Sequence, residues 1–339
     1  MPKQQLEIIE PITVEEFHTH YFLPRKPVII RNYFKSAPIA NITTMEHVAT
    51  AFNDVDVTVI EEYVDRMRRK KKLGGEEIKC KLSQHLEHIR KNPQTKYCIR
   101  EQKTPEEVRK YFTTPDYCNI RPDCELETNL FIANAGNVSR IHFDADHRST
   151  FLYQVAGRKR VVLIPETESK KLAPMFNFSW LFLEAMSDND REAFLDYTNA
   201  YEHILMPGEM LSFPMMMWHH LEYTDTGMSV NFRYGRSEVG DYMAKKIHPD
   251  VYSQNLAAQF HRHDTLSEEH LQAYEEIQAV AESSKYQPYE KYQQVREVCK
   301  KWYGRLCKTA IQQDYYASYE DDLIENIDYL NQCACYPYK

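Results

Sequence analysis

The sequence is poor in glycine and lacks the motifs that bind nucleotide phosphates. Only 9 of its 339 residues are glycine, against roughly 7% in average proteins. Neither GxGxxG nor GxxxxGK[ST] occurs, so a dinucleotide-binding or P-loop architecture is not expected.

Long apolar runs are also missing. No segment approaches the ~20 apolar residues that a membrane-spanning helix needs, and the first residues, MPKQQLEIIEP, contain no apolar run typical of a signal peptide. The eight cysteines have no regular spacing, which favours reduced thiols over a disulfide framework. We therefore expect a cytoplasmic protein with no membrane contact.

The chain has no excess of positive charge. Its 50 acidic residues outnumber 42 basic ones and give a net charge of −8, so the chain as a whole lacks the electrostatic character of a nucleic-acid binder. The exception is the run RMRRKKK at residues 66–72. Such a run is typical of a solvated loop, and it is also a possible contact for nucleic acid or another acidic substrate.

What the sequence does contain is enough apolar material for a sizeable core, with 42% hydrophobic residues. Three regions differ in pattern. Residues 1–96 mix helix starts with short strands, and we expect them to flank the main domain. Residues 97–248 carry short β-branched or aromatic runs separated by turn residues, with a helical excursion at about 179–198, which is typical of an antiparallel sandwich or barrel. Amphipathic stripes predict a helical bundle over residues 249–339.

The predicted strands share short length and β-branched or aromatic content. They are residues 27–34, 55–60, 129–135, 140–144, 150–156, 159–165, 209–214 and 229–234.

The most informative residues are His142 and Asp144 in the tripeptide HFD, and the distant His219 in PMMMWHHLEY. On a strand, side chains two residues apart point to the same face, so His142 and Asp144 can reach one point. A histidine from another strand would complete a set of two imidazoles and one carboxylate. That set leaves positions open on octahedral iron(II) for a cosubstrate and oxygen.

Four segments around these residues resemble the JmjC-type, cupin-like Fe(II)/2-oxoglutarate oxygenases in order and spacing. They are NLFIANAGNVSRIHFD, QVAGRKRVVLIP, PGEMLSFPMMMWHHLEY and SVNFRY. The branch they resemble contains the asparaginyl hydroxylase of hypoxia-inducible factor and the tRNA wybutosine hydroxylase. The resemblance implies a mainly β fold with α additions, built on a double-stranded β-helix (jelly-roll, cupin-like) core. It also implies Fe(II) and 2-oxoglutarate as cofactors.

Carried onto this sequence, the resemblance implies that His142, Asp144 and His219 bind the iron. His219 is preferred to its neighbour His220 because the family places a proline, three residues and an aromatic residue before the ligand. His220 would then face the other way, as an outer-layer or surface histidine. His147 is a rival ligand or a substrate contact, since the intervening residues ADHR depart from the family.

The same resemblance implies which residues hold 2-oxoglutarate. Lys159, two residues after a glycine in GRK, matches the cation that binds the far carboxylate. Tyr97 and Ser139 match hydroxyl-bearing positions beside that carboxylate. Asn231 matches an asparagine near the iron.

Arg233 departs from the family, since the hydroxylase relative has tryptophan there. Period-two geometry places Arg233 on the face of Asn231, toward the pocket. Other branches of the wider oxygenase superfamily hold the far carboxylate with an arginine about this far beyond the second histidine, so the resemblance implies that Arg233 is a rival cosubstrate anchor or a substrate anchor. The alternative is a surface arginine at the barrel rim.

These features predict an enzyme that hydroxylates a C–H bond, with a protein or peptide side chain as the favoured substrate. The alternatives are N-demethylation, and a tRNA base or a small molecule as substrate. An alternative of another class is a catalytically silent binding module. Helical stripes that include Trp302 and Leu306 predict a homodimer formed through the C-terminal helices.

Overall fold

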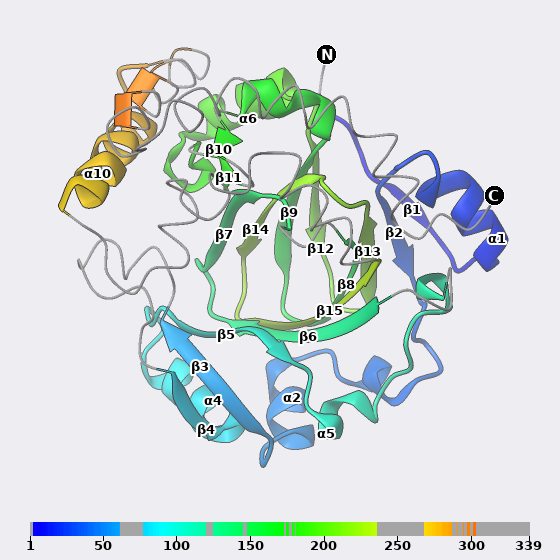
Figure 1. Cartoon of the computed structure of the whole chain (residues 1–339). Helices are drawn as coiled ribbons and strands as arrows, with labels where there is room; N and C mark the ends of the chain where they lie inside the picture. The colour runs from blue at the N-terminus through cyan, green and yellow to red at the C-terminus, as the bar shows by residue number, and fades with distance from the viewer. Residues whose placement is uncertain are drawn as a thin grey trace.

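The computed structural model describes residues 3–61, 77–119, 125–144, 148–172, 174–175, 178–179, 181–235, 268–286, 290, 294, 297–298 and 301–302. Its strands form two sheets that face each other (Figure 1). In spatial order the larger sheet contains β1 (Glu7–Ile9), β2 (Val28–Arg31), β13 (Glu209–Phe213), β8 (Ser149–Ala156), β15 (Gly227–Gly235), β6 (Glu125–Ala133), β5 (Tyr97–Lys103), β3 (Asp56–Glu61) and β4 (Ile78–Lys81). The smaller sheet contains β10 (Pro174–Met175), β11 (Phe178–Ser179), β7 (Val138–His142), β14 (Trp218–Tyr223), β9 (Lys159–Ile164) and β12 (Tyr201–Leu205).

An apolar core fills part of the space between the two sheets. Ile29 and Leu211 from the larger sheet belong to the same buried cluster as Val161 and Leu163 from the smaller one. The central pairings, such as β8 with β15 and β14 with β9, are antiparallel. The prediction of a mainly β, cupin-like jelly-roll fold is therefore confirmed.

Helices from the first 120 residues cover the outer face of the larger sheet (Figure 1). A second, larger cluster lies there, and β15 supplies every other residue to it. The β15 residues of this outer cluster are Met228, Val230, Phe232 and Tyr234. Alternation along the strand then turns Ser229, Asn231 and Arg233 toward the barrel interior.

The helical elements of this region are short. They are α1 (Val14–Phe17), η1 (His18–Phe22), η2 (Pro38–Asn41), α2 (Met45–Ala51), α4 (Leu82–Lys91), α5 (Glu106–Arg109) and η3 (Asp116–Cys118). The strands β1 and β2 extend one edge of the larger sheet, and β3 and β4 extend the other.

The helical excursion predicted at about 179–198 is shorter than expected. It consists of η5 (Leu183–Ala185) and α6 (Asp188–Tyr197), preceded by η4 (Glu166–Lys171) and the small strands β10 and β11. Helix α6 begins where it does because the Ser187 side chain caps it, accepting a hydrogen bond from the backbone N–H of Asp190 at 3.2 Å.

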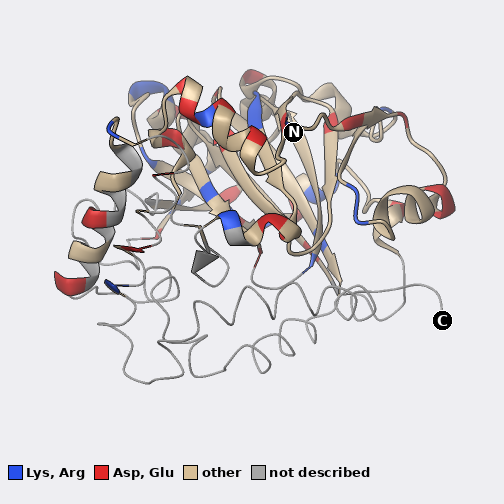
Figure 2. Ribbon diagram, turned by 90° about the horizontal axis from the view of Figure 1, so that it is seen from above, with Lys and Arg blue, Asp and Glu red and all other residues tan. Residues whose placement is uncertain are grey.

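Acidic and basic residues are interspersed along the described ribbon (Figure 2). The basic run at 66–72 lies outside the described residues. Most of the region 249–339 does too, so the C-terminal bundle is not supported. Within the described part of that region lies the helix α10 (Glu268–Glu282). Among the described helices, none has the length and apolar character needed to cross a membrane.

Gly157 shapes the β8–β9 turn that leads to Lys159. Its φ is +69°, and a Cβ atom there would lie 2.3 Å from the carbonyl oxygen of Thr226. We expect Gly157→Ala to lower the melting temperature by several degrees, since backbone strain of about 1–3 kcal/mol adds to the clash. Gly208→Ala is the matched control, because Gly208 has a φ of +89° but open space around its Cβ position. If both variants lowered the melting temperature equally, the close approach of Gly157 to the Thr226 carbonyl would not account for the loss of stability.

Candidate metal centre

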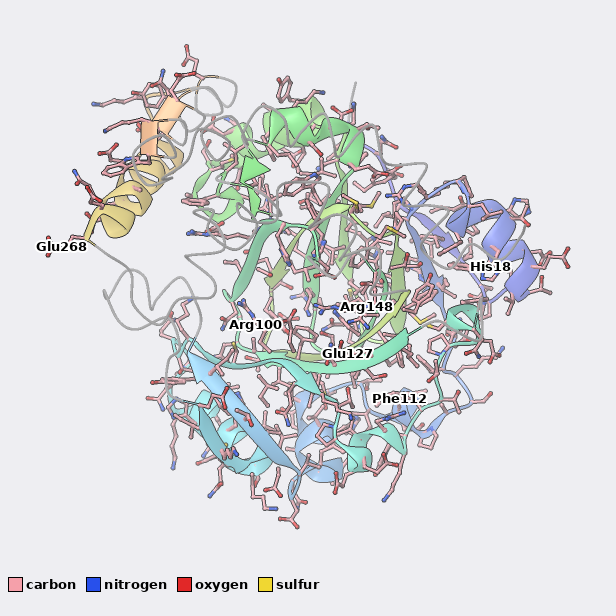
Figure 3. All side chains as sticks on the ribbon, viewed as in Figure 1. His18, Arg100, Phe112, Glu127, Arg148 and Glu268 are labelled. Atoms are coloured by element: carbon pink, nitrogen blue, oxygen red, sulfur yellow. The ribbon has the colours of Figure 1, made fainter. Side chains whose placement is uncertain are left out.

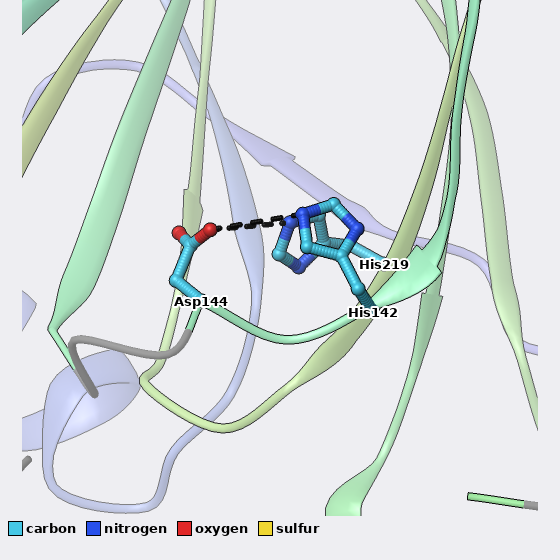
Figure 4. Close-up of side chains that lie close together, drawn as sticks. All are labelled: His142, Asp144 and His219. Atoms are coloured by element: carbon cyan, nitrogen blue, oxygen red, sulfur yellow. Dashed lines mark ion pairs between the residues drawn. The ribbon is translucent and has the colours of Figure 1, made fainter. Parts of the chain in front are cut away.

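His142, Asp144 and His219 meet inside the barrel (Figure 4). One potential ligand atom from each residue lies within 4.8 Å of the other two. Both histidine Nε2 atoms are 3.8 Å from the same carboxylate oxygen, Oδ1 of Asp144. The two nitrogens and the oxygen therefore surround one point, as ligands of a single cation do.

Backbone contacts fix how the two imidazoles present their nitrogens. Nδ1 of His142 lies 2.7 Å from the carbonyl oxygen of Arg140, and Nδ1 of His219 lies 3.1 Å from that of Met217. A carbonyl oxygen only accepts, so each Nδ1 carries the proton and donates it. In the neutral form of each ring the lone pair is then on Nε2, which faces Asp144.

Two neighbouring strands position the histidines. His219 of β14 pairs directly with His142, the last residue of β7. Asp144 follows the end of β7, so the expectation that the strand runs through residue 144 was wrong. The pairing of β7 with β14 is irregular between His219 and Leu221, and such bulges commonly re-aim side chains beside sites.

The carboxyl group of Asp144 is largely buried yet stabilised as an anion. Burial opposes the charged form, but Arg233 and the two histidines outweigh it and hold the pKa of Asp144 below its ordinary value. Burial also lowers the pKa of His219, against the opposing effect of Asp144. A carboxylate and a neutral imidazole are the forms that bind a divalent metal.

The alternation of β14 turns His220 away from this cluster, as expected. His220 is completely buried on the outer face of the smaller sheet, and burial lowers its pKa to about 4 while Glu184 opposes the shift. It is an outer-layer residue rather than a surface one. His147, the rival ligand, lies outside the described residues.

Lys159 is buried inside the barrel and has no carboxylate partner among the described residues. Its Nζ donates a hydrogen bond to Ser229 Oγ at 2.6 Å and lies 4.1 Å from the centre of the Tyr223 ring. Burial lowers the pKa of Lys159 from 10.5 to about 7. Such a lysine is available to neutralise an anion that enters the barrel.

The inner face of β15 connects Lys159 to the histidine cluster. Ser229 contacts Lys159, and four residues later Arg233 lies 3.4 Å from Asp144 Oδ1. Asn231 sits between them, directly opposite Asn129 of β6. Both asparagine Oδ1 atoms are buried without a hydrogen-bond partner among the described residues, which makes them available to a bound polar molecule.

Neither Tyr97 nor Ser139 has a contact with Lys159 among the described interactions. The Tyr97 ring stacks edge-on against His88 and packs against the outer cluster, so the structure does not bring it to Lys159. On the next position of β5, Cys98 is clustered with Tyr223 instead. Ser139 lies opposite Leu221 in the β7–β14 ladder. Leu221 packs against the apolar core between the two sheets, so Ser139 lies on the inner face of the smaller sheet.

Several residues of the site were not predicted. Ser229 and Tyr223 beside Lys159 could have been found by extending the period-two pattern back from Asn231 and forward from His219. The ion pair between Arg148 and Glu127 at the β6 side of the barrel, 2.6 Å between Nη2 and Oε2, gave no sequence signal (Figure 3).

The region that contains the cluster matches a known family. Residues 14–238 match the cupin-like domain. The chain belongs to the cupin-like domain family. Because the matched region includes every strand of the two sheets except β1, and all three clustered residues, the JmjC-type resemblance is confirmed for this cupin-like domain.

Individual relatives of this cupin-like domain share about a quarter of their aligned residues with this chain. Lysine-specific demethylase 8 of Xenopus tropicalis is 26% identical over 231 residues, which is 65% of this chain and 50% of the relative. JmjC domain-containing protein D of Dictyostelium discoideum is 27% identical over 251 residues, 66% of this chain and 54% of the relative. Lysine-specific demethylase JMJ30 of Arabidopsis thaliana is 27% identical over 244 residues, 65% of this chain and 52% of the relative. The chain therefore matches only about half the length of each relative.

Proposed function

We propose that this chain is an Fe(II)- and 2-oxoglutarate-dependent dioxygenase that hydroxylates a C–H bond on a protein or peptide side chain. The observation that carries the proposal is the convergence of His142, Asp144 and His219 on one point inside a cupin-like barrel. Two imidazoles and one carboxylate suit iron(II), and three protein ligands leave coordination positions open. A structural zinc site would need a fourth protein ligand.

The residues of the barrel have distinct tasks in this proposal. When bound, the iron and 2-oxoglutarate together activate oxygen, and 2-oxoglutarate is converted to succinate and carbon dioxide. The Nδ1 hydrogen bonds of His142 and His219 hold both rings in the ligating tautomer. Asp144 contributes the anionic ligand. The surrounding barrel excludes water and fixes the orientation of what binds there.

Lys159 is the better candidate than Arg233 for the far carboxylate of 2-oxoglutarate. Arg233 lies 3.4 Å from Asp144 Oδ1, which is the metal end of the cavity. Ser229, the partner of Lys159, is four residues away along β15, about 13 Å at the usual strand rise. The cosubstrate binds iron with its 2-oxo acid end, so its other carboxylate belongs at the Lys159 end.

The names of the relatives favour a protein substrate. Two of the relatives described above are named lysine-specific demethylases. Demethylation by this chemistry is hydroxylation of an N-methyl carbon followed by loss of formaldehyde, so N-demethylation is the specific alternative to stable hydroxylation. A tRNA base and a small molecule are weaker alternatives, since no observation on the described residues favours them.

Mass spectrometry of peptide pools separates these outcomes. The chain is incubated with iron, 2-oxoglutarate and pools of unmodified and lysine-methylated peptides. Gain of one oxygen atom by an unmodified peptide supports hydroxylation. Loss of the mass of one CH2 group from a lysine-methylated peptide, together with release of formaldehyde, supports demethylation. No change in any peptide, and no succinate, supports the silent binding module.

The pKa of Lys159 predicts how cosubstrate binding depends on pH. A carboxylate binds the protonated amine, and in the free protein this amine loses its proton above about pH 7. We therefore expect the KM for 2-oxoglutarate to rise from pH 7 to pH 8.5, by up to about tenfold per pH unit. Lys159→Arg is the control, because arginine stays charged and should flatten the profile. A profile with the same slope in both proteins would assign the titration to another group.

Other expectations stay predictions from the sequence. They are the homodimer through the C-terminal helices, a contact of residues 66–72 with nucleic acid or another acidic partner, the cytoplasmic location, and the division into residues 1–96, 97–248 and 249–339. The amphipathic stripes and the basic run support the first two.

A further inference from the structure

Arg233 contacts the oxygen of Asp144 that the histidines also face. Its Nη2 atom lies 3.4 Å from Asp144 Oδ1. The same oxygen is 3.8 Å from the Nε2 atoms of His142 and His219. A divalent cation at the cluster would use this oxygen as its ligand. The guanidinium and the cation therefore compete for one atom, and their positive charges repel each other.

Glu101 is a second acceptor for the same guanidinium nitrogen. Its Oε1 atom lies 2.5 Å from Arg233 Nη2, closer than Asp144 does. The side chain of Glu101 is 53% exposed, whereas those of Arg233 and Asp144 are 12% and 11% exposed. Arg233 thus bridges a carboxylate on the solvent side and a carboxylate in the cluster.

The backbone of β5 is distorted where it presents Glu101. The pairing of β5 with β6 shifts between Ile99 and Gln102, and Glu101 has a φ of +51°. This left-handed conformation is unfavourable for a residue with a side chain. Bulges of this kind re-aim side chains near functional sites, and here the bulge coincides with the contact to Arg233.

Glu127 does not compete for this role, although it lies opposite Arg233 in the β6–β15 ladder. Its Oε2 atom accepts from Arg148 at 2.6 Å, and its Oε1 atom accepts from Asn129 at 3.0 Å. Both oxygens of Glu127 are therefore engaged. It places a negative charge near Arg233 without the direct contact that Glu101 makes.

From this arrangement we propose that Glu101 is a positioning residue that sets the metal affinity of the site through Arg233. Glu101 holds the guanidinium at the barrel mouth, so that Asp144 Oδ1 is released to the cation. Without Glu101, Arg233 loses the closer of these two carboxylates, and its contact with Asp144 Oδ1 competes more strongly with the metal. This inference rests on the proposed metal site and adds a residue that tunes it.

Titration with Mn²⁺ tests the proposal without any catalytic readout. Mn²⁺ accepts the same nitrogen and oxygen ligands, and its binding to the full chain is followed by calorimetry or electron paramagnetic resonance. We expect Glu101→Gln to weaken Mn²⁺ binding about tenfold or more, as loss of a residue that orients a ligand typically does. Arg233→Gln should bind Mn²⁺ at least as tightly as the wild type.

The double variant distinguishes an effect of Glu101 that requires its contact with Arg233 from an effect of the Glu101 charge alone. In the Arg233→Gln background, adding Glu101→Gln should change Mn²⁺ affinity less than about threefold, because Glu101 acts through Arg233 and the two substitutions are therefore strongly coupled. Glu127→Gln is the matched control, and it too should change affinity less than about threefold. Glu101→Ala provides a second variant with the same expectation as Glu101→Gln, and thermal melts verify that each protein is folded.

Three results would overturn the proposal. Equal losses from Glu101→Gln with and without Arg233 would show that Glu101 acts only as a charge. Unchanged Mn²⁺ affinity in both Glu101 variants would show that it has no role. If wild type and Asp144→Ala bind Mn²⁺ alike, the metal site itself is misassigned, and this result separates failure of the proposed function from failure of the Glu101 role.

Discussion

Replacing Asp144 with alanine is expected to abolish turnover while the fold survives. The substitution removes the one carboxylate of the clustered set, and its loss should lower the rate of succinate formation by more than about 100-fold, beyond the effect of losing a supporting residue. The barrel should persist, because its cores lie elsewhere and Arg233 keeps its ion pair with Glu101.

The measurement compares succinate formation and circular dichroism for the two proteins. Asp54→Ala is the control for loss of an aspartate, since the Asp54 side chain is highly exposed on the surface. We expect full activity from that variant. An Asp144→Ala protein that is folded and fully active would contradict the assignment of the metal ligands.

Removing the amine of Lys159 is expected to have the second large effect. Lys159→Ala would leave a carboxylate of 2-oxoglutarate in a buried pocket without its counter-charge, a loss of about 2–5 kcal/mol. The KM for 2-oxoglutarate should rise tenfold or more. Steady-state kinetics over a range of cosubstrate concentrations measures this directly.

Arg233→Ala is the comparison for Lys159→Ala, because Arg233 is the rival anchor. It lies beside Asp144 at the metal end of the cavity, so its removal should change the KM for 2-oxoglutarate much less. A large increase in Arg233→Ala together with an unchanged value in Lys159→Ala would reverse the assignment.

The strands of the barrel could be predicted from sequence because each has the alternation and composition of a half-buried strand. The predicted run 159–165 corresponds to β9 and the run 150–156 to β8, within one residue at each end. The strand β12 was not predicted. Its sequence, YEHIL, is only half-buried over four of its five residues, so its apolar alternation is weak.

The clustered residues could also be predicted, but not how the chain brings them together. The order of motifs indicated His142, Asp144 and His219. The end of β7 at His142 depends on pairing with β14, which no local pattern encodes. Glu101 was beyond prediction for a similar reason: its direction depends on a left-handed residue in a bulge, and period-two reasoning fails across a bulge.

The most direct test of the account is whether the full chain converts 2-oxoglutarate to succinate in an iron-dependent manner. The assay supplies Fe(II), 2-oxoglutarate, oxygen and the peptide pools, and then omits each component in turn. We predict succinate in the complete mixture, none when iron or oxygen is omitted, and none with Asp144→Ala. No succinate in the complete mixture, or equal amounts from wild type and Asp144→Ala, would contradict the proposal that this barrel is an Fe(II)/2-oxoglutarate dioxygenase.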